Sequence, residues 1–258
     1  MPYLSRIRIN PLRKHSRELL ANPQKLHATV LGGIAHQPVT ERVLWRIDSD
    51  NPRQPLLYVL TNSRPDWHHL IEQAGWSDAD WDHDAEPRDY SPLLAQIAIG
   101  RQFAFRLTAN PVQSTRAPVK LTPPQEEARV KKGEPARGYR LGHRTVSEQL
   151  NWLLDRTASW GFTIPDAPGG QPAPGITSND TTTAPPAKEV RITARTRRSF
   201  TRKKSPQPVV LNTVTYEGQL IVTDADLLRD KLLAGIGPGK AYGCGLLTLA
   251  PARHRADA

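Results

Sequence analysis

The sequence contains little cysteine, no long apolar run and fewer acidic than basic residues. Cys244 is the single cysteine among 258 residues, so the chain cannot build an internal disulfide framework or a zinc site with four thiolates. This favours a reducing compartment, and we expect the cytoplasm. No run of about 18 apolar residues is present to cross a bilayer, and the N-terminal MPYLSRIRIN lacks the apolar stretch of a secretory signal. We therefore expect no membrane partner.

Signatures of a metal centre or of a common hydrolase are also missing. Neither G-x-S-x-G nor H-E-x-x-H occurs, and no Cys–His nucleophile pattern can be assigned from Cys244. Acidic side chains do gather between Asp78 and Asp89, with His83 among them. That stretch contains Trp and Pro and is typical of a solvated loop, which would bind a divalent ion only by a fortuitous geometry. We expect no metal and no cofactor.

Basic residues, in contrast, are abundant and unevenly spread. Lys and Arg number 35 against 25 Asp and Glu, which gives a net charge of +10. Between Lys188 and Lys204, eight basic residues accompany one acid, and such a cluster repels itself unless an anion is bound. Many clusters of this kind are only solvated surfaces, but this density favours nucleic acid, whose phosphates Arg and Lys neutralise. The candidate binding side chains are Arg195, Arg197, Arg198, Arg202, Lys203 and Lys204.

The apolar pattern of the first half predicts the order strand, helix, strand, strand, helix, strand, which is typical of a ferredoxin-like domain. Asn22 and Pro23 mark the first helix, as an N-cap and a proline at the first helical position. The second helix is expected from Asp66 to its stop at Gly75. The expected strands lie around Ile7 and Ile9, at 43–48, at 56–61 and at 103–108.

The second half repeats the plan less clearly. Thr145 and Glu148 form a capping box ahead of a helix that Gly161 would end, and Asp224 caps a second helix. Strands are expected at 189–196, 209–222 and 246–250, with the first strand of this half placed loosely near Tyr139; the basic segment would then project as an arm or hairpin. We expect an α+β fold of two tandem ferredoxin-like (RRM-like) domains with antiparallel sheets, at 1–115 and 138–258. Residues 116–137 would be a linker, and 165–186, rich in Pro and Gly, a mobile loop.

The segment 235–245, GIGPGKAYGCG, holds five of the 17 glycines of the chain. Glycine lets the backbone approach a phosphate and present its N–H groups, and Lys240 adds a cation. A P-loop is excluded because Ala234 and Ala241 replace its required Gly and Ser or Thr, and the dinucleotide pattern fails at Lys240 and Tyr242. The basic neighbourhood favours contact with a nucleic-acid backbone, and the other interpretation is a structural connection from helix to strand.

His27 is the histidine with the most informative surroundings. It follows the predicted N-cap by five positions and lies at the edge of an apolar stripe that includes Leu26 and Val30. Imidazole titrates near neutral pH and suits proton transfer to or from a ribose hydroxyl. On periodicity alone, however, a single histidine beside an apolar helix face is more often structural.

Several of these segments, taken together, resemble the CasE family, the CRISPR RNA endonuclease subunit of the type I-E Cascade complex. The most specific is YEGQLIVTDADLLRDKLLAGIGPGKAYGCGLLTLAP at 216–251, similar to the Gly-rich signature and final strand of that family. The N-terminal strand also matches, as do ANPQKLHATV at 21–30, VLWRID at 43–48 and FRLTANP at 105–111. The resemblance covers nearly the whole chain and implies two ferredoxin-like domains.

The resemblance also implies roles for individual residues. His27 falls on the helix-borne histidine of the family, Arg197 and Arg198 on the basic hairpin that grips the repeat stem, and the loop around Gly237, Gly239 and Lys240 on a segment against RNA. Several family members have Tyr three residues before the histidine, where this chain has Gln24. A tyrosine role is therefore not carried over, and Lys25 or Lys240 would supply compensating charge.

The expected function is a metal-independent endoribonuclease that cuts precursor CRISPR RNA at the 3′ base of each repeat hairpin, with the ribose 2′-hydroxyl as the attacking group. Its partners would be the repeat hairpin, in precursor and mature crRNA, and the other Cascade subunits. Two alternatives stay open at this point: a non-catalytic subunit that binds the hairpin, and a general nucleic-acid-binding protein.

Overall fold

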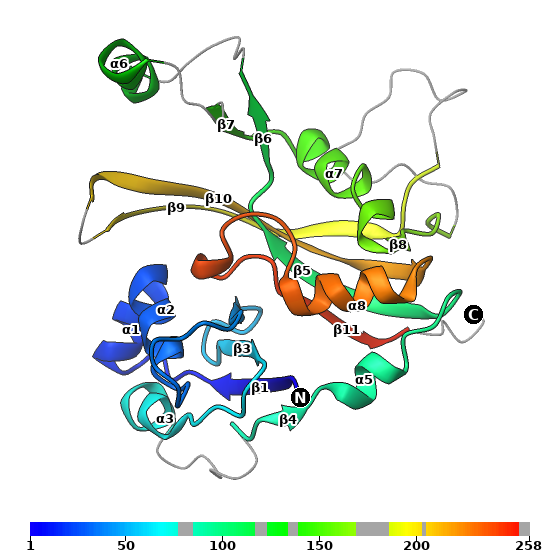
Figure 1. Cartoon of the computed structure of the whole chain (residues 1–258), viewed down its shortest axis with the longest axis horizontal. Helices are drawn as coiled ribbons and strands as arrows, with labels where there is room; N and C mark the ends of the chain where they lie inside the picture. Colours follow the sequence, from blue (N-terminus) through cyan, green and yellow to red (C-terminus); the bar gives the residue numbers. More distant parts are fainter. Residues whose placement is uncertain (77–84, 117–122, 134–138, 169–185, 203–204, 253–258) are drawn as a thin grey trace.

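Two antiparallel sheets, each covered by helices, form the body of the protein in the computed structural model (Figure 1). The structure describes residues 1–76, 85–116, 123–133, 139–168, 186–202 and 205–252. Within this part of the chain, no helix is long and apolar enough to cross a membrane. The predicted mobile loop at 165–186 lies largely outside the described residues, as do Lys203, Lys204 and most of the acidic segment that follows Trp76.

The first sheet has the strand order β2-β3-β1-β4, which is the order of a ferredoxin-like domain. Its strands are β1 (Tyr3–Arg8), β2 (Leu44–Asp48), β3 (Leu56–Thr61) and β4 (Arg88–Asp89), and its helices are α1 (Lys14–Ala21), α2 (Pro23–Leu31) and α3 (His68–Ala74). Helix α1 was not predicted. Helix α2 begins as predicted, because the Asn22 side chain accepts hydrogen bonds from the backbone N–H groups of Gln24 and Lys25.

The second sheet has the order β11-β5-β10-β8, the same ferredoxin-like order built from later strands. It contains β5 (Gln102–Ala109), β8 (Phe162–Thr163), β10 (Ser205–Val222) and β11 (Leu247–Pro251). Helices α7 (Val146–Leu154) and α8 (Ala225–Ala234) complete this domain, and the predicted capping box of Thr145 and Glu148 and the Asp224 cap are both present. A 3-10 turn, η1 (Ala158–Trp160), precedes β8, and Gly161 ends this turn instead of α7.

The prediction that residues 103–108 close the first sheet is wrong. These residues form β5, which pairs with β10 and β11 and packs Phe103, Phe105 and Leu107 into the core of the second domain. The fourth strand of the first sheet is β4, a pair of exposed residues without an apolar signal. Tyr139 lies in β7, which pairs with β6 outside both main sheets. We therefore propose a domain boundary between β4 and β5 in place of 1–115, 116–137 and 138–258.

Shorter elements occupy the connections between and within the domains. Helix α5 (Ser91–Ala95) joins β4 to β5, and β6 (Val112–Thr115) with β7 (Tyr139–Gly142) forms a separate hairpin. Helix α6 (Pro123–Lys132) lies within the segment that was predicted to be a linker. Ion pairs between residues one turn apart, such as Glu127 with Lys131, support this exposed helix.

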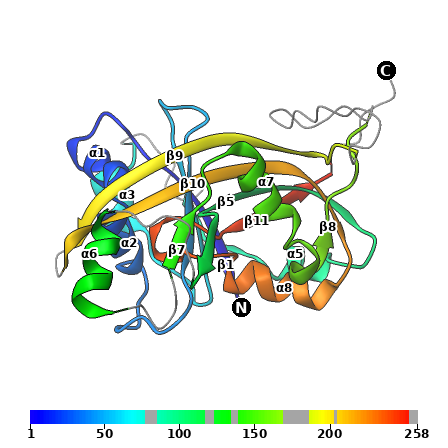
Figure 2. The same cartoon turned by 90° about the horizontal axis from the view of Figure 1, so that it is seen from above.

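A long hairpin projects from the second sheet over the helices of the first domain (Figure 2). Strand β9 (Val190–Arg202) pairs with β10 along most of its length, from Val190 opposite Gly218 to Arg202 opposite Ser205. This confirms the predicted arm for the residues that the structure describes. Because β9 is a continuous strand, its side chains alternate between the two faces of the hairpin.

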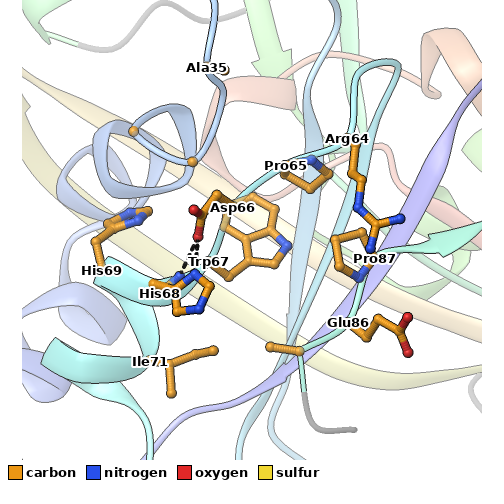
Figure 3. Close-up of a pocket in the computed structure, with 13 residues that line it drawn as sticks. Ala35, Arg64, Pro65, Asp66, Trp67, His68, His69, Ile71, Glu86 and Pro87 are labelled. Atoms are coloured by element: carbon orange, nitrogen blue, oxygen red, sulfur yellow. Dashed lines mark hydrogen bonds and ion pairs between the residues drawn. The ribbon is translucent and has the colours of Figure 1, made fainter. Parts of the chain in front are cut away.

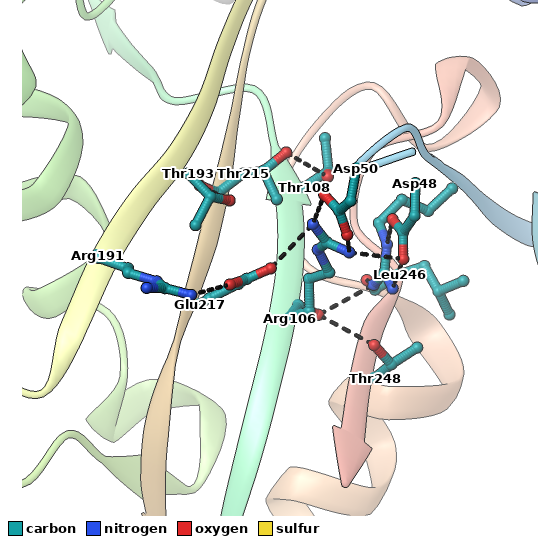
Figure 4. A network of polar contacts seen from close by, with 11 residues as sticks. Asp48, Asp50, Arg106, Thr108, Arg191, Thr193, Thr215, Glu217, Leu246 and Thr248 are labelled. Atoms are coloured by element: carbon teal, nitrogen blue, oxygen red, sulfur yellow. Dashed lines mark hydrogen bonds and ion pairs between the residues drawn. The ribbon is translucent and has the colours of Figure 1, made fainter. Parts of the chain in front are cut away.

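Arg46 joins the two domains from the middle of β2. Its guanidinium forms a bidentate ion pair with Asp48, at 2.6 and 2.8 Å, and its remaining nitrogen donates to the carbonyl oxygens of Arg106 and Leu246 in the second domain, both at 3.0 Å. The Arg46 side chain is 2% exposed. Arg106 extends the network, because it pairs with Asp48, Asp50 and Glu217 (Figure 4). We call Arg46, Asp48 and Arg106 the interdomain clasp.

We predict that Asp48→Ala lowers the free energy of unfolding by about 3 kcal/mol, because it leaves the buried Arg46 guanidinium without its bidentate carboxylate. Urea unfolding followed by circular dichroism measures this change. The control is Glu127→Ala, which removes one partner of an exposed pair on α6 and should change stability little. Equal stabilities of the two variants would contradict a structural role for the clasp.

Candidate functional site

His27 lies in the middle of α2, with one ring nitrogen occupied and the side chain half-buried. The indole N–H of Trp45, on the neighbouring strand β2, donates to His27 Nδ1 at 3.2 Å. Burial lowers the pKa of His27, because a charged imidazolium is poorly solvated in this position. Burial thus favours the neutral form of His27, the Trp45 indole positions its ring through Nδ1, and Nε2 is its second nitrogen.

The two residues predicted to support His27 differ in their surroundings. Lys25 is exposed and pairs with Glu18 on α1 at 2.9 Å, an interaction that lowers the pKa of Glu18. Gln24, one turn before His27, has a buried side-chain oxygen that meets no hydrogen-bond donor among the described residues. A buried acceptor without a donor costs free energy, so Gln24 is suited to accept a hydrogen bond from a bound molecule.

The Gly-rich segment 235–245 packs against the element that carries His27. Its short 3-10 turn η2 (Lys240–Tyr242) contacts both α2 and β2, and Figure 1 shows this loop between α2 and the β9–β10 hairpin. Gly243 has a φ of +80°, and a Cβ atom there would lie 2.7 Å from Cζ3 of Trp45. The structure thus brings together His27 and the predicted loop, two segments more than 200 residues apart in sequence.

Lys240 is part of a group of cations beside this loop. Burial lowers its pKa, and repulsion from Arg42 and Lys231 lowers it further. None of the three has an ion-pair partner within the described part of the chain. Arg42, just before β2, was not singled out from the sequence, because it is an isolated basic residue and only the fold brings it near Lys240.

The predicted arm residues divide between the two faces of the hairpin. Arg198 is half-buried on the face toward the Gly-rich loop, where its charge acts on the Cys244 thiol. Phe200 lies on the same face and meets the Tyr242 ring edge-on at 4.9 Å. Arg197 is exposed on the other face, since its partner Asn212 in β10 lies against Gly142 of β7. The arm therefore offers one arginine to the loop side and one to the opposite side.

Other members of the arm are less available for binding. Arg195 donates to Gln149 Oε1 at 2.8 Å and to the carbonyl oxygen of Arg144, so it fixes the hairpin to α7 and its N-terminus. Arg202 ends β9, and Lys203 and Lys204 lie outside the described residues. Gly237 has a φ of +70° and approaches the Trp152 ring, while Gly239 approaches Cys244. Close packing thus explains why glycine occupies these two positions, in addition to the predicted contact with a phosphate.

A cleft of about 1070 Å³ lies elsewhere on the first domain, between the end of α2 and the start of α3 (Figure 3). His68 pairs with Asp66, and His69 bonds to the carbonyl oxygen of Thr29, so each ring has a local structural partner. None of the predicted site residues lines this cleft. No group of three or more His, Cys, Asp or Glu side chains able to hold a metal ion occurs among the described residues, and the candidate cluster from Asp78 to Asp84 lies outside them.

A family model described as "CRISPR associated protein" matches residues 2–251. The chain belongs to this family. Within the CRISPR-associated family, it is 27% identical over 252 residues to the CRISPR-associated endoribonuclease Cse3 of Thermus thermophilus, covering 96% of this chain and 100% of that protein. A structure of Cse3 bound to a 19-nucleotide RNA superimposes with a TM-score of 0.70 at 26% identity, over 96% of this chain and 100% of the other. The resemblance inferred from the sequence is confirmed.

A second relative of this CRISPR-associated chain matches over a shorter stretch. It is the Cascade subunit CasE of Escherichia coli, which is 54% identical over 41 residues, or 16% of this chain and 21% of the other. The tandem ferredoxin-like fold expected from the sequence is also confirmed, because both sheets have the corresponding strand order and the Cse3 structure covers both domains.

We predict that Gly243→Ala disrupts the packing of the Gly-rich loop against Trp45 and destabilises the protein. A side chain at φ near +80° costs about 1–2 kcal/mol at any site, and here the new methyl would also press on the Trp45 ring. The control is Gly100→Ala, because Gly100 has a φ of +81° but open space around its Cβ position. Urea unfolding should show that the free energy of unfolding of Gly243→Ala is lower than that of Gly100→Ala by about 1–3 kcal/mol. Equal stabilities would mean that the loop does not depend on this contact.

Proposed function

We propose that this chain is a metal-independent endoribonuclease that cleaves precursor CRISPR RNA at the 3′ base of the repeat hairpin. We also propose that it stays bound to the product as a subunit of Cascade, in the cytoplasm. The observation that supports this most is the junction at which α2, with His27, meets the Gly-rich loop and the Arg198 face of the arm. The relatives named above, an endoribonuclease that binds RNA and a Cascade subunit, support the same assignment.

The proposed reaction is an internal transesterification. The ribose 2′-oxygen bonds to the scissile phosphorus, the bond from phosphorus to the 5′-oxygen breaks, and one proton moves in net from the 2′-oxygen to the 5′-oxygen. The products are a 2′,3′-cyclic phosphate and a 5′-hydroxyl. His27 transfers a proton at one end of this process, and Lys240 and Arg198 offset the negative charge that develops on the phosphate.

Recognition of the hairpin is assigned to shape and charge. An A-form stem has a deep, narrow major groove that side chains cannot read, so contacts to phosphates, 2′-hydroxyls and unpaired bases dominate. The projecting hairpin supplies arginines on both of its faces, which suits a backbone that curves around it. Because these contacts do not involve the bond that breaks, they persist after cleavage and retain the product.

One alternative has a specific observation in its favour. This alternative is a subunit that binds the hairpin without cleaving it efficiently. It is favoured by Gln24, which stands where several family members have tyrosine and which cannot titrate. A single-turnover assay on one repeat hairpin separates this binding subunit from the enzyme. The other alternative, a nucleic-acid-binding protein unrelated to CRISPR, is no longer tenable because the family model matches residues 2–251.

We predict that His27→Ala lowers the single-turnover cleavage rate by roughly a hundredfold or more, because it removes the proton-transferring group. Binding of the hairpin should change little, since His27 is half-buried and the arm supplies the affinity. The assay is run in EDTA with saturating protein, and binding is measured in parallel. Equal losses of rate and affinity, or a rate that requires magnesium, would contradict the proposed division of roles.

We predict different defects for the two arm arginines. Arg198→Ala, on the loop face, should lower the rate at saturating RNA, whereas Arg197→Ala should weaken binding and reduce the log–log salt slope by about one unit. The matched control is Arg191→Ala, because Arg191 is in the same strand but already pairs with Glu217 at 3.0 Å. If Arg197→Ala leaves affinity and slope unchanged, that arginine serves solubility alone.

A further inference from the structure

The side chain of Trp45 contacts both His27 and the Gly-rich loop. It is 1% exposed in the core of the first domain. Its indole nitrogen lies 3.2 Å from His27 Nδ1, and its ring edge lies where a side chain at Gly243 would have to go. The rigid Trp45 ring thus fixes the position of the His27 imidazole relative to the Gly-rich loop.

The direction of the hydrogen bond is fixed by chemistry. An indole nitrogen is only a donor, so His27 Nδ1 must be the acceptor and cannot itself carry a proton. A neutral imidazole has one N–H group, which therefore lies on Nε2. If Nδ1 carried a proton, its N–H and the Trp45 N–H would face each other as two donors with no acceptor between them.

We propose that Trp45 is a positioning residue that holds His27 as the Nε2–H tautomer, so that His27 acts toward RNA as the proton donor. This inference rests on the proposed function and assigns one of the two roles that the sequence left open for His27. A base role would need an unprotonated Nε2 and hence a proton on Nδ1, which the Trp45 contact opposes.

The number of protons lost and gained is balanced if His27 protonates the leaving 5′-oxygen. As the bond from phosphorus to the 5′-oxygen breaks, the proton on Nε2 passes to that oxygen, while the proton of the 2′-hydroxyl passes to water. Loss of this proton leaves a negative charge on the His27 ring, which the Trp45 N–H stabilises at Nδ1. The ring then regains a proton on Nε2 from water. A neutral imidazole acting as an electrophile is an established pattern in enzymes.

The neighbouring residue strengthens this assignment. Trp45 and Arg46 are consecutive in β2, so their side chains point to opposite faces of the sheet. Arg46 is held by the interdomain clasp, and this fixes the backbone from which Trp45 projects. The indole therefore has little freedom to turn away from His27.

The first test is the tautomer of His27 in the full-length protein. Nitrogen-15 NMR of histidine-labelled protein distinguishes a protonated from an unprotonated ring nitrogen, and comparison with His27→Ala assigns the signals. We expect Nε2 protonated and Nδ1 unprotonated. A protonated Nδ1 in the neutral ring would overturn the inference, and this readout holds even if the protein cleaves no RNA.

The second test removes the donor and keeps an aromatic ring. Trp45→Phe should lose the tautomer preference and lower the single-turnover rate by roughly tenfold, the effect of one hydrogen bond. The control is Trp67→Phe, because Trp67 is equally buried and donates to Ser5 Oγ at 2.8 Å, away from His27. Melting temperatures show whether both variants fold. An unchanged tautomer and rate in folded Trp45→Phe would overturn the proposal.

The third test separates an acid from a base. A hairpin with sulfur in place of the scissile 5′-oxygen has a leaving thiolate, whose conjugate acid has a pKa of about 8.5 and which needs no proton to leave. With this RNA, His27→Ala and Trp45→Phe should lose most of their defect. A defect of full size would assign His27 as the base and overturn its role as donor. If the wild-type protein cleaves neither RNA, the proposed function itself fails.

Discussion

The buried ion pair between Arg46 and Asp48 is the interaction on which the arrangement of the two domains depends. A guanidinium with 2% of its side chain exposed is stable only if its charge and its N–H groups are satisfied. Here the charge is met by Asp48 within β2, and the remaining nitrogen donates to two carbonyl oxygens of the second domain. Leu44 and Leu60 of the first domain also pack with Leu246 of the second in one buried apolar cluster. The first domain is therefore fixed against the second in one orientation.

This orientation creates the candidate site, because neither domain holds it alone. The first domain contributes His27 on α2 and Trp45 on β2, and the second contributes the Gly-rich loop and the arm. Each domain on its own is an ordinary ferredoxin-like unit, and the candidate site exists only where they meet. Lys240 of the second domain lies in the 3-10 turn that packs against α2, the helix of His27, and Arg198 lies on the hairpin face toward the same loop. An RNA backbone that reaches both must bridge the junction.

Local signals in the sequence were sufficient for much of the fold. The Asn22 cap, the Thr145 and Glu148 capping box and the Asp224 cap each act within one helical turn, and all are present. The alternation at Phe103 and Phe105 identified a buried strand but not its partner, since period two shows that one face is buried and says nothing of which core covers it. Strand β4 had no apolar signal to find. That is why residues 103–108 were assigned to the wrong sheet.

The site was only partly predictable for a related reason. His27 and the Gly-rich loop were found from their residue types, and the resemblance connected them. Trp45 was not singled out, because a tryptophan in a strand signals core packing, and its contact with His27 exists only after α2 folds onto β2. The opposite directions of Arg197 and Arg198 follow from strand alternation, but only once β9 is known to be continuous through both.

We propose that the scissile phosphate lies at the domain junction, between His27 and the Gly-rich loop. The most direct measurement is a structure of the full chain with a repeat hairpin that lacks the attacking 2′-hydroxyl and so cannot be cleaved. We expect His27 Nε2 within about 3 Å of the 5′-oxygen at the scissile bond, with Lys240 and Arg198 facing the same phosphate. A bound hairpin whose scissile phosphate lies in the cleft beside α3, or out of reach of His27, would contradict it.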